Sequence, residues 1–112
     1  MFVLGIDPGL SITGYGLVEG SHTPQAHRAG VIRTEPDLAT PQRLADLYRG
    51  LSDVIAETMP EVIALETVFT NRNLQTAISV GRASGVALLA AAEAGIPVFE
   101  YVPTAINSAV TG

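Results

Sequence analysis

The two residues best placed to do chemistry in this sequence are Asp7 and Glu66. Asp7 ends an apolar run over residues 2–6 and is followed by a Pro-Gly turn, and Glu66 ends a second run over residues 61–65. Runs so short and apolar are typical of central strands covered on both faces, and α/β proteins place their chemistry at the carboxyl ends of such strands. Without cysteine or clustered histidine, the ligands on offer are hard oxygens, which favour magnesium or manganese over zinc. The pattern predicts a divalent-metal site.

The chemistry of such a site would be phosphodiester cleavage. Two divalent ions about 3.5–4 Å apart can hold a phosphodiester, activate a water and stabilise the leaving oxygen. Two carboxylates are fewer than the three or four ligands that a two-ion site normally needs. The alternative is that Asp7 merely begins a turn and Glu66 is a surface acid, but the same arrangement on two core strands favours a functional site.

The elements that must position these acids can be placed from apolar periodicity and turn residues. Strands are expected over residues 2–7, 13–19, 29–34, 61–66 and 96–101, with a hairpin connection at residues 20–24. Thr40 is expected to cap a helix with Pro41 at its first position, and Met59-Pro60 to end it. A second helix should run from about residue 74 to 94 and stop at Gly95, and a third should begin at Pro103.

This order predicts an α/β fold with a mixed five-stranded sheet flanked by helices, in a single domain over residues 1–112 whose C-terminal helix is incomplete. If the first and fourth strands are neighbours, they lie roughly 4.8 Å apart. Asp7 and Glu66 would then share one edge of the sheet and could share metal ions.

Composition limits the remaining classes. The 112 residues are 47% hydrophobic and contain no cysteine, which excludes a disordered chain, disulfides and thiolate metal sites. The sequence offers no signal peptide and no apolar stretch free of charges and turn residues that is long enough to cross a membrane, so a soluble protein is expected. The net charge is −5, which counts against nucleic-acid binding. All six basic residues are arginine, and those at 28, 33, 43 and 49 are expected on solvated faces.

Several segments carry a family resemblance. Residues 4–16, LGIDPGLSITGYG, closely resemble the opening of the RuvC-type Holliday-junction resolvases, and residues 64–69, ALETVF, resemble their second acidic motif. Further matches occur at residues 80–86, 97–101 and 109–112. The resemblance implies a ribonuclease-H-like fold and a cytoplasmic homodimer that makes magnesium-dependent symmetric nicks in four-way DNA junctions during recombination and repair. A branch-migration helicase complex is an implied partner.

The resemblance also implies roles for the acids. Asp7 and Glu66 correspond to catalytic metal ligands for two magnesium ions, with manganese as a substitute. The family's other two acids lie in a helix beyond Gly112, after a glycine-rich basic loop. The 112-residue chain alone is therefore expected to be inactive.

DNA contacts are expected around the second acidic motif. Phe69 matches a position where the family stacks an aromatic ring on a base; the alternative is a core residue that closes the strand. Arg72 is expected to contact phosphate, and Asn73 either to contact DNA or, like Asn71, to cap the second helix. Asn107 stands where the family tends to carry a lysine facing the scissile phosphate, and it supplies no charge.

The second helix is apolar nearly all round. Two interior glycines at positions 81 and 85 suggest close approach of another backbone, since glycine costs about 1 kcal/mol in a helix. Close packing on the sheet of the same subunit is one explanation. The resemblance favours another, a two-fold dimer interface that includes Leu74, Ile78, Gly81 and Gly85.

Other functions fit parts of the sequence. A phosphate- or nucleotide-binding module of the actin and sugar-kinase type also opens with a Gly-Ile-Asp-x-Gly turn, and Gly9, Thr13 and Gly14 would suit that role. The chain is too short for the two lobes of those proteins, however. A related nuclease acting on ribosomal RNA precursors and an inactive structural dimer are further alternatives.

Overall fold

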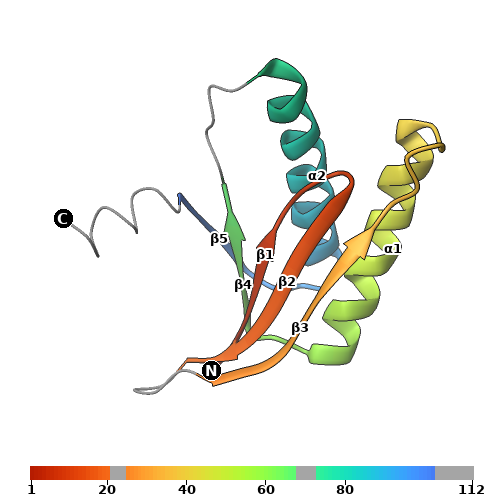
Figure 1. The fold of residues 1–112 in the computed structure, drawn as a ribbon. Coiled ribbons are helices and arrows are strands. Elements are labelled where there is room, and N and C mark those ends of the chain that lie inside the picture. The colour runs from red at the N-terminus through yellow and green to blue at the C-terminus, as the bar shows by residue number, and fades with distance from the viewer. Residues whose placement is uncertain (21–24, 68–72, 103–112) are drawn as a thin grey trace.

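The computed structural model describes residues 1–20, 25–67 and 73–102 (Figure 1). Five strands and two helices follow one another along these residues in the predicted order. Their bounds are β1 Phe2–Asp7, β2 Ile12–Glu19, β3 Gln25–Arg33, α1 Thr40–Thr58, β4 Val62–Glu66, α2 Leu74–Glu93 and β5 Val98–Tyr101. The helix predicted from Pro103 onward lies outside the described residues.

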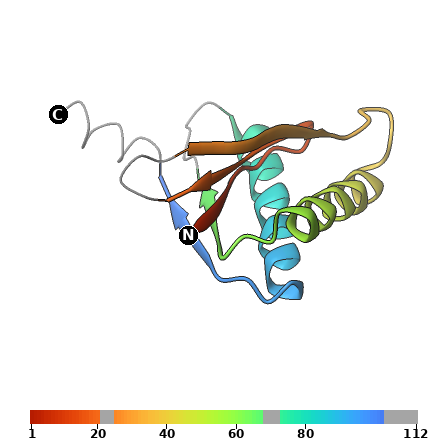
Figure 2. The ribbon, with the colours of Figure 1, turned by 90° about the horizontal axis from the view of Figure 1, so that it is seen from below.

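The strands form one mixed sheet in the order β3-β2-β1-β4-β5. β1, β2 and β3 pair antiparallel, whereas β1 pairs parallel with β4 and β4 parallel with β5. Both α1 and α2 cover the same face of this sheet (Figure 2). The α/β class and the mixed five-stranded sheet are therefore confirmed, and β1 and β4 are neighbours as the site requires.

The hydrophobic core lies between the sheet and the two helices. β1 contributes Leu4 and Ile6, and β4 contributes Ile63 and Leu65, all of them almost fully buried. α1 faces them with large side chains, whereas α2 faces them with alanines. The buried helical residues are Leu47, Leu51, Val54 and Ile55 on α1 and Ala83, Ala87, Ala90 and Ala91 on α2.

The helix ends partly differ from the prediction. The predicted N-cap at Thr40 is wrong: the first helical hydrogen bond runs from the Arg43 N–H to the Ala39 carbonyl, so Ala39 is the cap and contributes no side-chain hydrogen bond. Met59 ends α1 in a left-handed conformation with φ 48°, and Gly95 follows α2 with φ 72°. Both predicted helix stops are confirmed.

The strand bounds shift by a few residues. β3 begins at Gln25, four residues earlier than predicted, because it pairs with the whole of β2 through a bulge at Leu17 and Val18. β5 begins two residues later than predicted, at Val98.

α2 is also the described helix that meets the length and hydropathy of a membrane span, with 20 residues and a mean hydropathy of 1.2. The sequence-based expectation concerned apolar stretches free of charges and turn residues, and α2 is not one of these, because it contains Arg82 and two glycines. Arg82 interrupts it, and its four buried alanines pack into the core below the sheet. One face of α2 is therefore part of the hydrophobic core, although only 22% of its most apolar window is buried.

Candidate active site

Asp7 and Glu66 are the last residues of two neighbouring parallel strands. Ile6 pairs with Leu65 across β1 and β4, so the next residue of each strand is one of the two acids. The carboxyl ends of β1 and β4 lie at the upper end of the sheet in Figure 1, where the β1–β2 turn and the start of α2 also lie. Asp7 is exposed and Glu66 is partly exposed. The fold thus brings together the two acids that the sequence singles out.

The titration of Glu66 is perturbed by its surroundings. Partial burial, hydrogen bonding to Asp7 and the negative charge of Asp7, in that order, raise the pKa of Glu66 to about 7. The pKa of Tyr101 is also raised, first by burial and then by the charges of Glu66 and Asp7. A carboxyl group that resists ionisation next to a second acid is a place where a cation would be stabilising.

Tyr101 is a neighbour of the site that sequence reasoning missed. It pairs with Glu66 across β4 and β5, which places it next to the acids. The available signal was its position at the end of the last predicted strand, because parallel neighbours end at the same edge of a sheet.

The donor set fits a hard divalent cation. Two carboxylates from adjacent strand ends can bind one ion between them, and oxygen ligands are those that magnesium and manganese prefer. Within the described part of the chain, no third acid or histidine gathers with Asp7 and Glu66. The chain supplies two ligands of such a site from these residues.

The turn after Asp7 is fixed by Thr13, which is fully buried. The Thr13 hydroxyl donates a hydrogen bond of 2.6 Å to the Gly9 carbonyl and accepts one of 3.1 Å from the Gly9 N–H. A Cβ at Gly9 would lie 2.4 Å from the Ile12 carbonyl oxygen, so the turn requires glycine there. Because the Gly9 N–H already has a partner, it is a poor phosphate donor, which disfavours the nucleotide-binding alternative.

Arg43 is a second residue whose role the sequence did not show. It was expected on a solvated face, but it is half-buried and binds across the fold. Its Nε donates to the Thr34 hydroxyl at 3.0 Å and its Nη2 to the Ser11 hydroxyl at 3.1 Å. The Thr34 hydroxyl in turn donates to the Leu10 carbonyl at 2.6 Å. Arg43 therefore ties α1 and the end of β3 to the turn that follows Asp7.

The predicted DNA contacts are only partly covered by the structure. Phe69, Arg72 and Asn107 lie outside the described residues, and so does Asn71. Asn73 is the N-cap of α2, and its side-chain oxygen accepts a hydrogen bond of 2.7 Å from the Thr76 N–H. The capping prediction is confirmed for Asn73, and its contact with DNA stays a prediction.

The predicted dimer residues form one exposed face of α2. Leu74 is 76% exposed and Ile78 is 43% exposed. No atom lies within 4 Å of the position that a Cβ would take at Gly81 or Gly85. The alternative, in which these glycines pack closely on the sheet of the same subunit, is therefore wrong for the part of the chain that the structure describes.

A mixed sheet with paired carboxylates at the ends of two neighbouring parallel strands places the chain among α/β domains of the ribonuclease-H-like class. Comparison with known proteins narrows this class. Residues 3–112 match the family described as crossover junction endodeoxyribonuclease RuvC, and the chain belongs to this family.

Individual relatives agree with that assignment. The crossover junction endodeoxyribonuclease RuvC of Desulforamulus reducens is 48% identical over 115 residues, a match that spans 100% of this chain and 69% of the relative. The structure of Thermus thermophilus RuvC in complex with Holliday junction substrate matches with a TM-score of 0.89 at 34% identity, over 97% of this chain and 69% of that one. The yeast mitochondrial Holliday junction resolvase Ydc2 shares the fold, with a TM-score of 0.65 at 19% identity over 95% of this chain and 54% of its own.

Proposed function

We propose that this chain carries the catalytic core of a structure-selective endonuclease that resolves four-way DNA junctions by metal-dependent phosphodiester hydrolysis. The single observation that supports it most is the Asp7–Glu66 pair at one sheet edge, in a chain that belongs to the RuvC family. The relatives are named crossover junction endodeoxyribonucleases, and a structural neighbour is described with Holliday junction substrate. Both point to junction DNA as the substrate.

In this proposal Asp7 and Glu66 hold magnesium, or manganese in its place, with two ions in the complete site. The raised pKa of Glu66 supports a cation at this position, since a positive charge would let both carboxylates ionise. The bound ions would supply an activated water and neutralise charge on the scissile phosphodiester. The chain itself holds the ligands in place, because Thr13 and Gly9 fix the turn that follows Asp7.

Two carboxylates do not satisfy two ions. All the acids of residues 1–112 belong to the described part of the chain, and no third one joins the pair. We therefore expect further carboxylates, from outside residues 1–112, to complete the site. For the same reason, we expect the 112-residue chain alone not to cut junctions.

The DNA contacts proposed from the sequence extend this site. Phe69 would stack on a base near the junction centre, a contact worth roughly 1–3 kcal/mol. Arg72 and Asn73 would contact phosphates, and Asn107 would donate a hydrogen bond to phosphate without adding charge. Asn73 could serve both roles, since capping uses its side-chain oxygen and leaves its amide N–H groups for DNA.

Symmetric cutting of a junction requires two sites at a fixed separation, and the exposed face of α2 supplies a surface for a homodimer. Leu74, Ile78, Gly81 and Gly85 lie on this face, where the described residues of their own subunit leave them uncovered. A second copy would cover these apolar side chains by a two-fold arrangement. A protein acting on chromosomal junctions would work in the cytoplasm, beside a branch-migration helicase complex.

The test is cleavage of a synthetic four-way junction by the full-length protein with and without magnesium. Asp7→Asn should lower the cleavage rate by about 10³-fold or more while leaving junction binding intact, because it removes a metal ligand and not a DNA contact. Asp53→Asn, which neutralises an exposed acid on α1, is the matched control and should cut normally. If Asp7→Asn cuts at the rate of that control, Asp7 is not a metal ligand.

A further inference from the structure

A polar groove runs beside the candidate active site. Its lining residues come from the β1–β2 turn, the start of α1 and the first half of α2, three segments that lie in the upper part of the molecule in Figure 1. Two adjoining hollows of about 500 Å³ and 360 Å³ form it and share Leu10, Arg43, Gln75 and Ser79 as lining residues. The groove starts at Gly9, two residues after Asp7.

The charge of this groove differs from that of the whole chain. Arg43 and Arg82 line it, and no acid does, although the protein carries a net charge of −5. Within residues 1–20, 25–67 and 73–102, neither arginine forms an ion pair, whereas Arg28 is paired with Glu57 and Arg49 with Asp46. The groove is thus a local positive surface on an acidic protein.

The Arg43 guanidinium is fixed in position and keeps N–H groups that can bind an anion. Its bonds to Thr34 and Ser11 use two of its N–H groups and fix the guanidinium in place. The other N–H groups of a guanidinium suit phosphate oxygens, and a side chain that is already ordered loses less entropy on binding. Ser79 and Gln75 on the opposite wall add neutral hydrogen-bond donors.

The groove occupies its own face of α2. At roughly 100° per residue, Gln75, Ser79 and Arg82 lie between the exposed face that carries Gly81 and Gly85 and the buried alanine face. Ile78 belongs to the exposed face and also lines one of the two hollows, so a second copy of the chain on that face would border the groove along one edge. Gln75 and Arg82 are seven residues apart, which is about 10 Å along the helix, or the axial rise of roughly three phosphates in one strand of B-DNA.

Resting on the proposed function, we propose that this groove binds the sugar-phosphate backbone of one DNA strand next to the active site, with Arg43 and Arg82 as its phosphate contacts. Such contacts are independent of base sequence and release counterions, so they position the strand and strengthen binding at low salt. They would also provide basic contacts that the overall charge of the chain does not suggest.

The test is the salt dependence of junction binding by the full-length protein, measured without divalent metal between about 50 and 200 mM salt so that nothing is cut. Arg82→Gln should weaken binding equally for junctions of different sequence and reduce the slope of log K against log salt by about 1, and the double variant with Arg43→Gln by about 2. Ser79→Asp, which puts a negative charge into the groove, should weaken binding as well. Arg43→Lys keeps the charge and should keep most of the slope.

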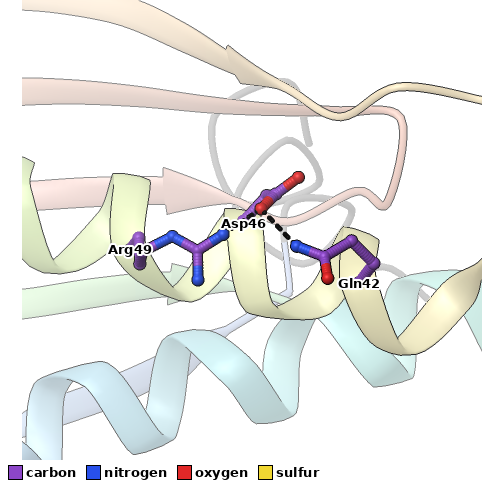
Figure 3. A network of polar contacts seen from close by, with 3 residues as sticks. All are labelled: Gln42, Asp46 and Arg49. Carbon is purple, nitrogen blue, oxygen red and sulfur yellow. Dashed lines mark hydrogen bonds and ion pairs between the residues drawn. The ribbon is translucent and has the colours of Figure 1, made fainter. Parts of the chain in front are cut away.

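Arg49→Gln is the matched control, since it removes the same charge from α1. Figure 3 shows Arg49 beside Asp46, whose Oδ1 also accepts a hydrogen bond of 3.0 Å from Gln42 Nε2, so the guanidinium already has a partner.

If Arg82→Gln and Ser79→Asp keep the slope and affinity of Arg49→Gln while the wild type still binds and cuts junctions, the groove is not a DNA site and the proposed function stands. If the wild type neither binds nor cuts junctions, the proposed function itself fails. Arg82 is exposed and Ser79 lies outside the buried core, so these two variants keep the test open even if Arg43→Gln unfolds.

Discussion

The half of the molecule around α1 and the half around α2 are built in opposite ways. α1 places large apolar side chains such as Leu47 and Leu51 in the core, where both are fully buried. α2 places alanines in the core and leaves large apolar side chains outside, with Leu74 76% and Leu89 52% exposed. The charges differ in part: Arg28 and Arg49 near α1 have acid partners, whereas Arg43 at the start of α1 bonds to the Thr34 and Ser11 hydroxyls instead.

Near α2, in contrast, Arg82 has no acid partner within the described residues, and β4 ends in a carboxyl group with a raised pKa. An exposed apolar face and two adjacent acids are each unfavourable in an isolated subunit, and the exposed Arg82 guanidinium is a charge open to an anionic partner. Each becomes favourable when a second subunit, a phosphate or a divalent cation is bound. The difference teaches that the α1 half stabilises the fold, while the α2 half retains features that only binding partners satisfy.

The largest expected effect tests this division directly. Leu51→Ala should lower the free energy of unfolding by about 2–5 kcal/mol, because it removes a fully buried side chain from the core. Leu89→Ala, the matched change on α2, should cost less than about 1 kcal/mol in the monomer. Urea unfolding at several protein concentrations measures both.

If α2 faces a second copy, the loss caused by Leu89→Ala grows with protein concentration, whereas the loss caused by Leu51→Ala does not. Equal losses at every concentration would show that the two halves do not differ in this way.

A smaller effect is expected at Gly85. Gly85→Leu should weaken the homodimer by about 1–3 kcal/mol for each copy, because a two-fold interface places the added side chain twice. Gly85→Ala should stabilise the isolated helix by about 1 kcal/mol, since no atom of the subunit lies within 4 Å of the new Cβ. Analytical ultracentrifugation follows the first change and thermal unfolding the second.

Ala87→Leu is the control for this position, because Ala87 is only 2% exposed and a larger side chain there should destabilise the monomer itself. A Gly85→Leu variant that sediments as the wild type does would place the dimer interface on another surface.

The contrast between the halves also explains how far the sequence could lead. The order of elements and the meeting of Asp7 and Glu66 could be predicted, because apolar runs, turns and strand ends are local signals and parallel pairing aligns the ends. Even Met59 and Gly95, which end the two helices, could be predicted from neighbouring residues. The N-cap at Thr40 could not, since the choice between adjacent residues depends on the backbone geometry of the first turn.

Contacts between residues far apart in the sequence could not be predicted, for a physical reason. Arg43 bonds to Thr34, nine residues away, and to Ser11, 32 residues away, and no local pattern signals such a contact. An apolar helix looks the same in sequence whether its outer face is covered by its own sheet or left open. Only the structure shows that Gly81 and Gly85 lie on the open side.

The smallest expected effect concerns the pH dependence of stability. The pKa of Glu66 is raised from 4.5 to about 7 in the folded state, so the folded chain binds more protons than the unfolded chain between these values. The stabilising contribution of protonated Glu66 is therefore complete below pH 4.5 and is lost as the pH rises through about 7. Glu66→Gln removes this dependence, so its Tm should exceed that of the wild type by a growing margin, reaching a few degrees, as the pH rises from about 5 to 8.

The difference between the Tm values of Glu66→Gln and the wild type is taken at each pH, because the contributions of all other titrating groups cancel in this difference. Added magnesium should raise the Tm of the wild type at about pH 8 and close much of the gap, because a bound cation favours the ionised pair. Glu66→Gln should respond less, and Asp53→Asn should respond as the wild type does, since Asp53 lies on α1 away from the site. A Tm difference that stays constant across this pH range would mean that Glu66 titrates as an ordinary surface acid, and the α2 half would then carry no electrostatic strain at the end of β4.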